Sequence, residues 1–241
     1  NGVLRLNQGG MSVPYLNIDY AFADNTRVDL KSQSFVFKST QFTDTKFSSE
    51  GVLNGAMSHT NFSDWALDLD IDSKRLLVLN TKETEESLYY GTGFVEGNIN
   101  VSGPMNQLFI EANVTTSKGT IFKIPLNDSE MISENSYIKF LSPKEKLKKT
   151  QGRSIKLDDI EGVEMEFNMD VTDDAEIEIV IDKETGSSIR GRGNGSMLAQ
   201  INTNDKFLMF GDFLVLSGYY NYSLGRLIQK KFKLVKDGSL V

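Results

Sequence analysis

The chain has 241 residues, 39% of them hydrophobic and 24% charged, and a formal net charge of −7. Its length allows one large all-β domain or two small ones, and its acidic balance gives no support for binding nucleic acid or an anionic membrane surface. The absence of cysteine excludes disulfides and thiolate chemistry, and it fits a compartment such as a periplasm, where folding does not depend on the thiol state.

The sequence shows no signal peptide and no apolar run long enough to span a membrane. It begins Asn-Gly-Val-Leu-Arg, which is an unusual start for a mature protein. We therefore expect the chain to be a piece of a longer protein whose targeting information lies elsewhere.

Alternating apolar and polar residues predict a succession of strands in the first half of the chain. Side chains of a strand point to opposite faces with period two. The alternation is clean over residues 16–22 and 65–72, weaker over 28–37, and returns over 95–101 and 108–114. Each of these segments is expected to have one apolar face.

The clearest alternation lies between residues 162 and 182. Apolar residues occupy every second position from Val163 to Val171, and acidic or amide side chains separate them. A turn or a bulge is expected at residues 172–174, and the same rule resumes from Ala175 to Ile181. These residues predict two strands with one apolar face and one acidic face.

The remainder of the chain continues the series of strands over residues 207–216, 219–224 and 232–235. Only the stretch Ser223–Lys231 is compatible with a helical period. The lysine-rich stretch 142–159 is expected to be a mobile loop. Many strands at a spacing of roughly 8–12 residues predict an all-β sheet, sandwich or barrel.

No group of residues supports catalysis. His59 is the single histidine, lies in a Ser/Thr/Asn-rich stretch, and is expected to be a solvated loop residue. The pairs Glu164/Glu166 and Glu176/Glu178 are expected to be solubilising charges on an exposed strand face. We therefore predict that the protein is not an enzyme and needs no cofactor.

Asp68, Asp70 and Asp72 have the spacing of a calcium-binding loop. The sixth position of such a loop should be glycine and is Ser73, and the twelfth should be glutamate and is Leu79. A solvated strand face is the better interpretation, and we predict no metal site.

The apolar face of the predicted strands has three interpretations. A β-sandwich would bury two such faces against each other. An outer-membrane barrel would turn them toward lipid, but the dense rows of Asp and Glu would then crowd a narrow lumen. A curved sheet would keep a concave apolar face available for lipid tails, in a trough about 33 Å long for strands of about ten residues.

Several ordered motifs between Trp65 and Val241 resemble the C-terminal domain of the TamB translocation and assembly proteins. The stretches that carry this resemblance are Gly91–Pro104, Leu108–Ala112, Thr116–Thr120, Ile124–Leu126, Ile189–Gly195, Gly211–Leu224 and Lys230–Leu234. Residues 1–64 share only the general pattern. We expect them to be N-terminal strands of the same groove, ahead of a TamB-like groove over residues 65–241.

The resemblance implies a curved, antiparallel or mixed β-sheet that forms an elongated, taco-like groove with an apolar interior. It also implies a periplasmic location in a Gram-negative bacterium, with an inner-membrane anchor on the full-length protein and an outer-membrane TamA- or BamA-type barrel as partner. The family is similar to bridge-like lipid-transfer proteins and is implicated in phospholipid movement and outer-membrane protein assembly.

The main hypothesis is a non-catalytic groove that carries phospholipid acyl chains between the inner and outer membranes. The residues expected to line it are Trp65, Leu67, Leu69, Ile71, Val95, Ile99, Val101, Leu108, Ile110, Ala112, Val114, Val163, Met165, Phe167, Met169, Val171, Ile177, Ile179 and Ile181. The alternative is a scaffold that guides outer-membrane protein strands by β-augmentation. A filled structural β-domain without a ligand is the third hypothesis.

Overall fold

The computed structural model describes residues 1–85, 87–126, 162–203, 207–224 and 228–234, which form a nearly all-β protein. Fifteen strands join one mixed sheet, and the 3-10 helix η1 (Pro14–Leu16) is the only helix in these ranges. None of the described segments forms a helix long and apolar enough to cross a membrane. The predicted all-β class with a mixed sheet is confirmed, and the loop expected at 142–159 lies outside the described residues.

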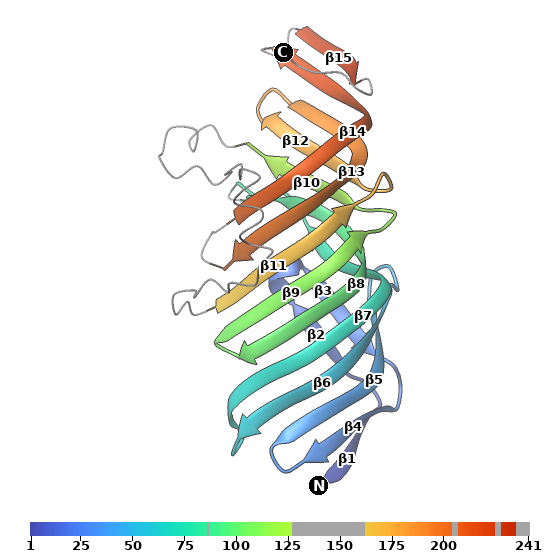
Figure 1. Cartoon of the computed structure of the whole chain (residues 1–241), viewed down its shortest axis with the longest axis vertical. Coiled ribbons are helices and arrows are strands. Elements are labelled where there is room, and N and C mark those ends of the chain that lie inside the picture. The colour runs from blue at the N-terminus through green and yellow to red at the C-terminus, as the bar shows by residue number, and fades with distance from the viewer. Residues whose placement is uncertain (86, 127–161, 204–206, 225–227, 235–241) are drawn as a thin grey trace.

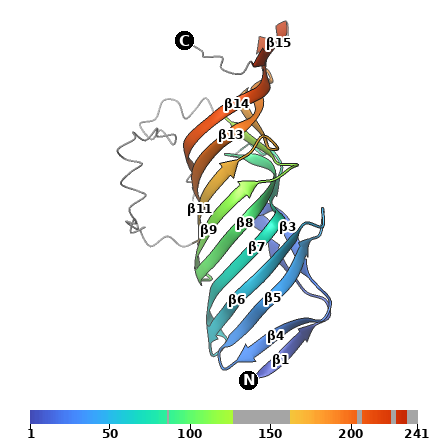
Figure 2. The same ribbon diagram turned by 45° about the vertical axis from the view of Figure 1, so that its right-hand side comes forward.

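The strands follow one another along an elongated, twisted sheet, with the first strands at one end and the last at the other (Figures 1 and 2). Their bounds are β1 Gly2–Leu6, β2 Gly10–Val13, β3 Ile18–Phe22, β4 Thr26–Lys31, β5 Ser34–Asp44, β6 Glu50–Thr60, β7 Ser63–Thr81, β8 Tyr90–Pro104, β9 Gln107–Thr116, β10 Ile121–Pro125, β11 Gly162–Val171, β12 Glu176–Asp182, β13 Ser187–Asn202, β14 Phe207–Leu224 and β15 Ile228–Leu234.

The long strands β8 and β13 hold the middle of the sheet together, because each pairs with two shorter strands along one of its sides. Residues 90–92 of β8 pair with β10, and residues 95–102 pair with β9. In the same way, residues 187–192 of β13 pair with β12, and residues 195–202 pair with β11. β9 pairs in parallel with β11, and β10 pairs in parallel with β12. These two pairs connect β8 to β13.

The shorter strands between β8 and β13 are interrupted by turns at the same level of the sheet. A turn at residues 117–120 separates β9 from β10, and a turn at 172–175 separates β11 from β12. The register also shifts in β7 between Ser73 and Leu76, and in β13 between Arg192 and Gly193. Such irregularities bend a strand. The sheet therefore has a first wall (β9, β11 and the strand segments paired with them) and a second wall (β10, β12 and the segments paired with them).

Hydrogen bonds from the two turns fix the line along which the walls meet. The Thr172 N–H donates to Thr116 Oγ1 at 2.9 Å, and the Thr172 hydroxyl donates to the Thr116 carbonyl at 3.1 Å. The Glu176 N–H donates to the Thr120 carbonyl at 2.9 Å. The turns therefore continue the parallel pairing of the strands on either side of them, and the bend is part of the hydrogen-bonded sheet.

The pairing register puts the predicted apolar positions on one face of the sheet. Residues that lie directly opposite each other in adjacent strands share a face. One such row crosses ten strands through Leu4, Val28, Phe37, Gly55, Leu69, Val101, Ile110, Met165, Ile201 and Phe207. The acidic residues between these positions consequently point to the opposite face.

The N-terminal end of this apolar face is filled by the chain itself. Ile18 and Tyr20 of β3 are buried in a cluster with Phe42, Leu53, Leu69, Ile71, Leu76, Leu77 and Phe94. The Tyr20 hydroxyl donates to the Leu77 carbonyl at 2.7 Å, which satisfies its polar end. Figure 1 shows β2 and β3 lying behind the main sheet, at the level of β7 and β8. A covered core therefore occupies this end of the interior.

Two local predictions are wrong. Ser223–Lys231 was the stretch compatible with a helix, but its described residues belong to β14 and β15, because they pair with each other across the sheet. His59 is not a solvated loop residue. It lies in β6, is buried, and stacks on Phe62 with 4.4 Å between ring centroids, beside Trp65 at 4.7 Å. The rings of Phe62 and Trp65 pack against the imidazole and account for its burial.

Asp44 anchors the turn between β5 and β6 and is almost fully buried. Its carboxylate accepts hydrogen bonds from the backbone N–H groups of Lys46 at 2.9 Å, Phe47 at 2.6 Å and Ser49 at 2.6 Å, and from the Ser49 hydroxyl. Ser49 Oγ in turn accepts the Leu77 N–H at 2.8 Å. Burial opposes the charge of Asp44, but these donors outweigh it and hold the pKa of the carboxyl below its usual value.

We expect Asp44→Asn to lower the free energy of unfolding by about 1–3 kcal/mol at neutral pH, because an amide nitrogen would face backbone donors in a buried site. Urea denaturation measures this loss, with the exposed Asp24→Asn as control. Since the folded-state pKa of Asp44 is depressed, its stabilisation is complete above the unfolded pKa of about 3.9 and is lost as the pH falls through the folded value. The difference between wild type and variant should therefore shrink in acid. Equal effects of the two variants would contradict this role.

Candidate functional site

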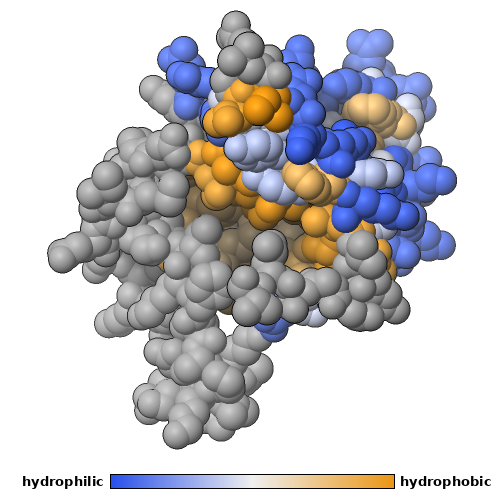
Figure 3. All heavy atoms as spheres, turned by 90° about the horizontal axis from the view of Figure 1, so that it is seen from above, coloured by the Kyte–Doolittle hydropathy of each residue, from blue (hydrophilic) through white to orange (hydrophobic). Residues whose placement is uncertain are grey.

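An apolar cavity of about 400 Å³ lies between the two walls of the bent sheet. Figure 3 looks down the long axis from the end that carries β15, and it shows hydrophobic residues around a hollow, with hydrophilic residues on the outside. The cavity is lined by Leu16, Val78, Leu79, Tyr89, Gly93, Val95, Ile99, Ala112, Val114, Thr116, Thr120, Phe122, Ile124, Leu126, Phe167, Met169, Val171, Ile177, Ile179, Met197, Ala199, Ile201, Phe207, Met209, Phe210, Gly211, Asp212 and Phe213.

Both walls contribute residues that the sequence placed on the apolar face. Those that line the cavity are Val95, Ile99, Ala112, Val114, Phe167, Met169, Val171, Ile177 and Ile179. The first seven come from the first wall or its edge at the bend, and the two isoleucines come from β12 in the second wall. The structure thus brings together segments that are up to 84 positions apart, from Val95 to Ile179.

The other residues expected to line the groove lie outside this cavity. Leu67, Leu69, Ile71 and Val101 belong to or pack against the N-terminal core. Trp65 packs against Phe35 and His59, and Met165 is buried at 1% exposure. Leu108, Ile110, Val163 and Ile181 are half-buried and do not reach the cavity.

Several lining residues were not among those expected from the sequence. Phe122, Ile124, Met197, Ala199, Phe207 and Met209 line the cavity but were not expected there. The run Phe207–Phe210 is continuously apolar, so its periodicity does not say which side faces inward. The pairing register shows which side faces inward, because Met209 lies opposite Ala199, and Ala199 lies opposite Phe167.

The two lining threonines are already committed to the backbone. Thr116 Oγ1 accepts the Thr172 N–H at 2.9 Å. Thr120 Oγ1 accepts the Phe94 N–H at 3.0 Å, and its one proton lies within reach of the carbonyl oxygens of Phe94 at 2.9 Å and Ser117 at 2.7 Å. These hydroxyls hold the bend together, and the rest of the lining is apolar apart from Tyr89 and Asp212.

Tyr89 spans the side of the cavity that lies opposite the bend. It immediately precedes β8 in the second wall and stacks on Phe122, with 5.6 Å between ring centroids. Its ring also lies 5.2 Å from that of Phe207, the first residue of β14 in the first wall. The Tyr89 hydroxyl donates to the Tyr15 hydroxyl at 3.3 Å, and burial raises the pKa of Tyr89. This aromatic bridge joins the two walls on the side of the cavity opposite the bend, which we call the mouth.

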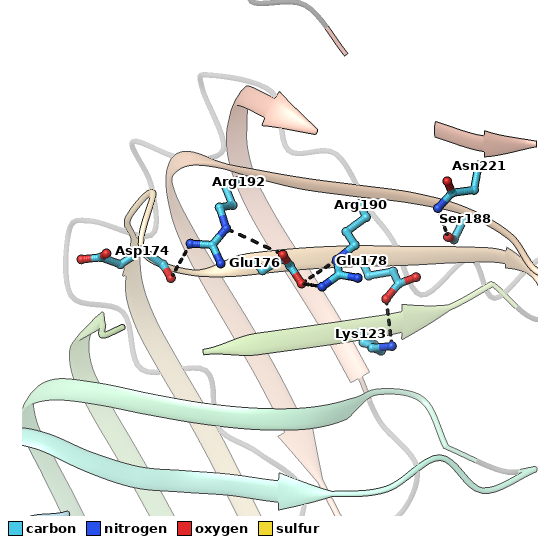
Figure 4. Close-up of polar contacts among 8 residues, drawn as sticks. All are labelled: Lys123, Asp174, Glu176, Glu178, Ser188, Arg190, Arg192 and Asn221. Atoms are coloured by element: carbon cyan, nitrogen blue, oxygen red, sulfur yellow. Dashed lines mark hydrogen bonds and ion pairs between the residues drawn. The ribbon is translucent and has the colours of Figure 1, made fainter. Parts of the chain in front are cut away.

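The outer face of the second wall carries a ladder of ion pairs (Figure 4). Glu176 contacts Arg190 and also Arg192 at 3.7 Å, and Lys123 Nζ lies 2.9 Å from Glu178. Burial opposes ionisation of Glu178, but the hydrogen bond and the charge of Lys123 outweigh it and hold its pKa below the usual value. A catalytic acid needs the reverse shift. The ion pairs account for the positions of Glu176 and Glu178 on this face.

The calcium-like aspartates also lie on the outer face. Asp70 accepts a hydrogen bond from the Asn100 amide, and Asp72 accepts one from the Asn98 amide, each at 3.1 Å. Among the described residues, no group of three or more His, Asp or Glu side chains is arranged to hold a metal ion. The cross-strand amides account for the positions of Asp70 and Asp72.

Comparison with protein families supports the resemblance found in the sequence. The model of the TamB C-terminal domain matches residues 40–241. Comparison with curated proteins and with solved structures finds no match. The matched region begins within β5 and includes both walls and nearly all of the cavity lining, while β1 to β4 lie ahead of it.

We expect Tyr89→Ala to open the mouth and to speed the binding and release of an apolar fluorescent probe by several-fold, because the contact between the walls is lost. Tyr89→Phe keeps the rings and loses only the hydroxyl contact with Tyr15, so its rates should stay close to wild type. Stopped-flow fluorescence measures both, with Tyr219→Ala, outside the cavity, as control. Unchanged rates in Tyr89→Ala would show that the aromatic bridge does not control access.

Proposed function

Because the chain belongs to the TamB C-terminal domain family, we propose that it is a non-catalytic groove that carries phospholipid acyl chains between the inner and outer membranes. Family membership indicates a protein of the Gram-negative envelope with a role in outer-membrane assembly, associated with TamA- or BamA-type partners. The proposal adds the lipid cargo, the periplasmic path and an inner-membrane anchor on the full-length protein.

The observation that carries the proposal is the apolar cavity between the walls. Its volume of about 400 Å³ is within the range of small-molecule sites, roughly 300–1,000 Å³. Filling this space would remove apolar surface of both walls from water, which is favourable. An acyl chain supplies such filling at about 0.8 kcal/mol per buried methylene.

The lining of the two walls suits an acyl chain that slides along the cavity. The lining offers carbon surface from both walls, and its threonine hydroxyls are bound to the backbone. A chain that slides along such a surface exchanges one methylene contact for another, so the free energy changes little from one position to the next. Met169, Met197 and Met209 add flexible side chains that adapt to irregular contact. The lipid headgroup would remain in water outside the mouth.

The filled N-terminal core limits where such a chain can lie. Leu16 of η1 lines the cavity and also packs against the core formed around Ile18 and Tyr20. The same helix therefore closes this end of the space. We therefore propose that the acyl path runs from Leu16 toward the β13–β14 end. Leu67, Leu69 and Ile71, which were expected to line the groove, belong to or pack against the filled core instead.

We expect Phe167→Asp to abolish the co-purification of phospholipid, because a carboxylate would be buried in the apolar wall without a partner. Asn168→Asp is the matched control, since it adds the same charge at the next residue, on the opposite face of β11. Native mass spectrometry, with organic extraction and lipid analysis, measures the bound lipid. Ile179→Asp tests the second wall in the same way.

Two outcomes would contradict the lipid proposal. Folded wild-type protein that carries no lipid and takes none from phospholipid vesicles would exclude the cavity as an acyl site. Equal lipid content in Phe167→Asp and Asn168→Asp would place the lipid elsewhere on the molecule. Circular dichroism must show the wild-type β-sheet content in both variants for this comparison to hold.

The alternative proposal is a scaffold that guides outer-membrane protein strands by β-augmentation. The observation in its favour is that β15 pairs only with β14 in the described part of the chain, which leaves its other edge for a further strand. Under this proposal, a proline at a β15 position whose amide points away from β14 would impair outer-membrane assembly more than Phe167→Asp. The opposite order would favour the lipid path.

A further inference from the structure

A two-residue turn joins β6 to β7 and displays Phe62 on the outside of the protein. Thr60 pairs with Ser63, and Asn61 and Phe62 between them both have positive φ, at 52° and 62°. This is the pattern of a type I′ turn, whose second central position favours glycine because a side chain is strained there. Phe62 is nevertheless present and is 71% exposed, more than any other large hydrophobic residue that the structure describes. A strained residue that buries so little of itself points to a use outside the fold.

The ring of Phe62 rests on a rigid aromatic base. It stacks on the buried His59, and Trp65 lies 4.7 Å from the His59 ring and 6.3 Å from the Phe62 ring. The His59 Nδ1 accepts the Phe62 N–H at 3.0 Å. Phe35 packs on the far side of Trp65, with 5.8 Å between ring centroids. These contacts fix the turn and leave the outer part of the Phe62 ring uncovered.

The neighbouring β8–β9 turn adds a second exposed apolar side chain. Met105 is 55% exposed, and its N–H donates to the Trp65 carbonyl at 2.9 Å. We call Phe62, Trp65 and Met105 the tip patch. The rim continues because the Gly162 N–H of β11 donates to the Asn106 carbonyl at 2.8 Å, and it reaches the mouth through the paired ends of β13 and β14. Figure 1 shows these strand ends along the left-hand edge of the sheet.

Both turns lie in stretches without charge. Residues 51–63 and 97–110 contain no Asp, Glu, Lys or Arg, although these residues make up 24% of the chain. Charges resume at the exposed Asp64, just behind the tip. Moving a charge out of water is costly, so a surface free of charge can approach an apolar medium where most of this acidic protein cannot.

The two hairpins lie inside the sheet and not at one of its ends. β5 pairs with β6 on one side of them, and β9 pairs with β8 on the other. The turns at Phe62 and Met105 therefore keep their place on the rim whichever strands join the sheet at its ends.

We propose that the rim of the first wall docks on the surface of a phospholipid bilayer through the tip patch. Phe62 and Met105 would enter the boundary between headgroups and acyl chains, and Trp65 would lie at the membrane–water interface, which tryptophan favours. The turns project from the same edge of the sheet, which fits a flat surface better than the deep pocket of a protein partner. Docking does not require the cavity to hold an acyl chain, although it would bring the mouth toward the bilayer.

The test is flotation of the whole chain with vesicles of neutral phosphatidylcholine. We expect binding that changes little as salt is added, because the tip patch has no charge to screen. Trp65 is the single tryptophan of the chain, so phosphatidylcholine with brominated acyl chains should quench its fluorescence. Phe62→Gly should lower the partition coefficient by about tenfold or more, for the loss of one buried phenylalanine side chain.

Phe62→Gly also separates docking from folding. Glycine relaxes the turn, so the urea midpoint should stay at the wild-type value or rise while vesicle binding falls. Phe62→Asn, which also tolerates positive φ, should show the same loss of binding. The matched control is Phe47→Ser, which removes an exposed ring from the turn at the opposite ends of β5 and β6 and should bind like wild type.

Several results would overturn the proposal. They are no flotation with neutral vesicles, flotation without quenching of Trp65, and equal losses in Phe62→Gly and Phe47→Ser. A concentration-dependent dimer that disappears in Phe62→Gly, with no vesicle binding, would assign the tip patch to a second copy of the chain. Phe167→Asp should still bind vesicles, so a failure of the lipid path and a failure of docking give different results.

Discussion

The whole structure depends on an alternation of apolar and polar side chains that stays in register through a bend. A shift of one residue in any strand pair would turn that strand's apolar set to the solvent. The chain keeps the register across the bend by interrupting the shorter strands with turns, while β8 and β13 run through and pair on both sides of it. Threonine side chains then satisfy the backbone groups that the bend would otherwise expose.

The apolar face has three different environments along the molecule. At the N-terminal end, β3 covers it and completes a packed core. In the middle, the two walls face each other across a cavity and meet again at Tyr89 and Phe207. At the β15 end, the same face is exposed beside lysines. The same repeating pattern thus forms a packed core, the walls of a cavity and an exposed surface, because different neighbours lie opposite it.

The acidic face gives the outside of the sheet a charged and polar surface. Carboxylates, amides and arginines alternate with the apolar residues and pair across strands, as Glu176 does with Arg190 and Asp72 with Asn98. Exposed pairs of this kind add little to the free energy of unfolding. Their main effect is on specificity, since a strand that entered the sheet with its faces reversed would bury these charges.

The sequence by itself determined the strands, the apolar and acidic faces and the family, because side-chain period and local motifs are local properties. It placed Phe167 and Ile179 on the apolar face, but it could not show that they lie across one cavity. That depends on pairing between β11, β13 and β12, which is long-range in the chain. Only the tertiary structure decided that Leu69 and Ile71 belong to a filled core, that His59 is buried among aromatic rings, and that Phe207 and Met209 complete the cavity. Each of these outcomes depends on which segment packs opposite, and the period of a single strand carries no information about its partner.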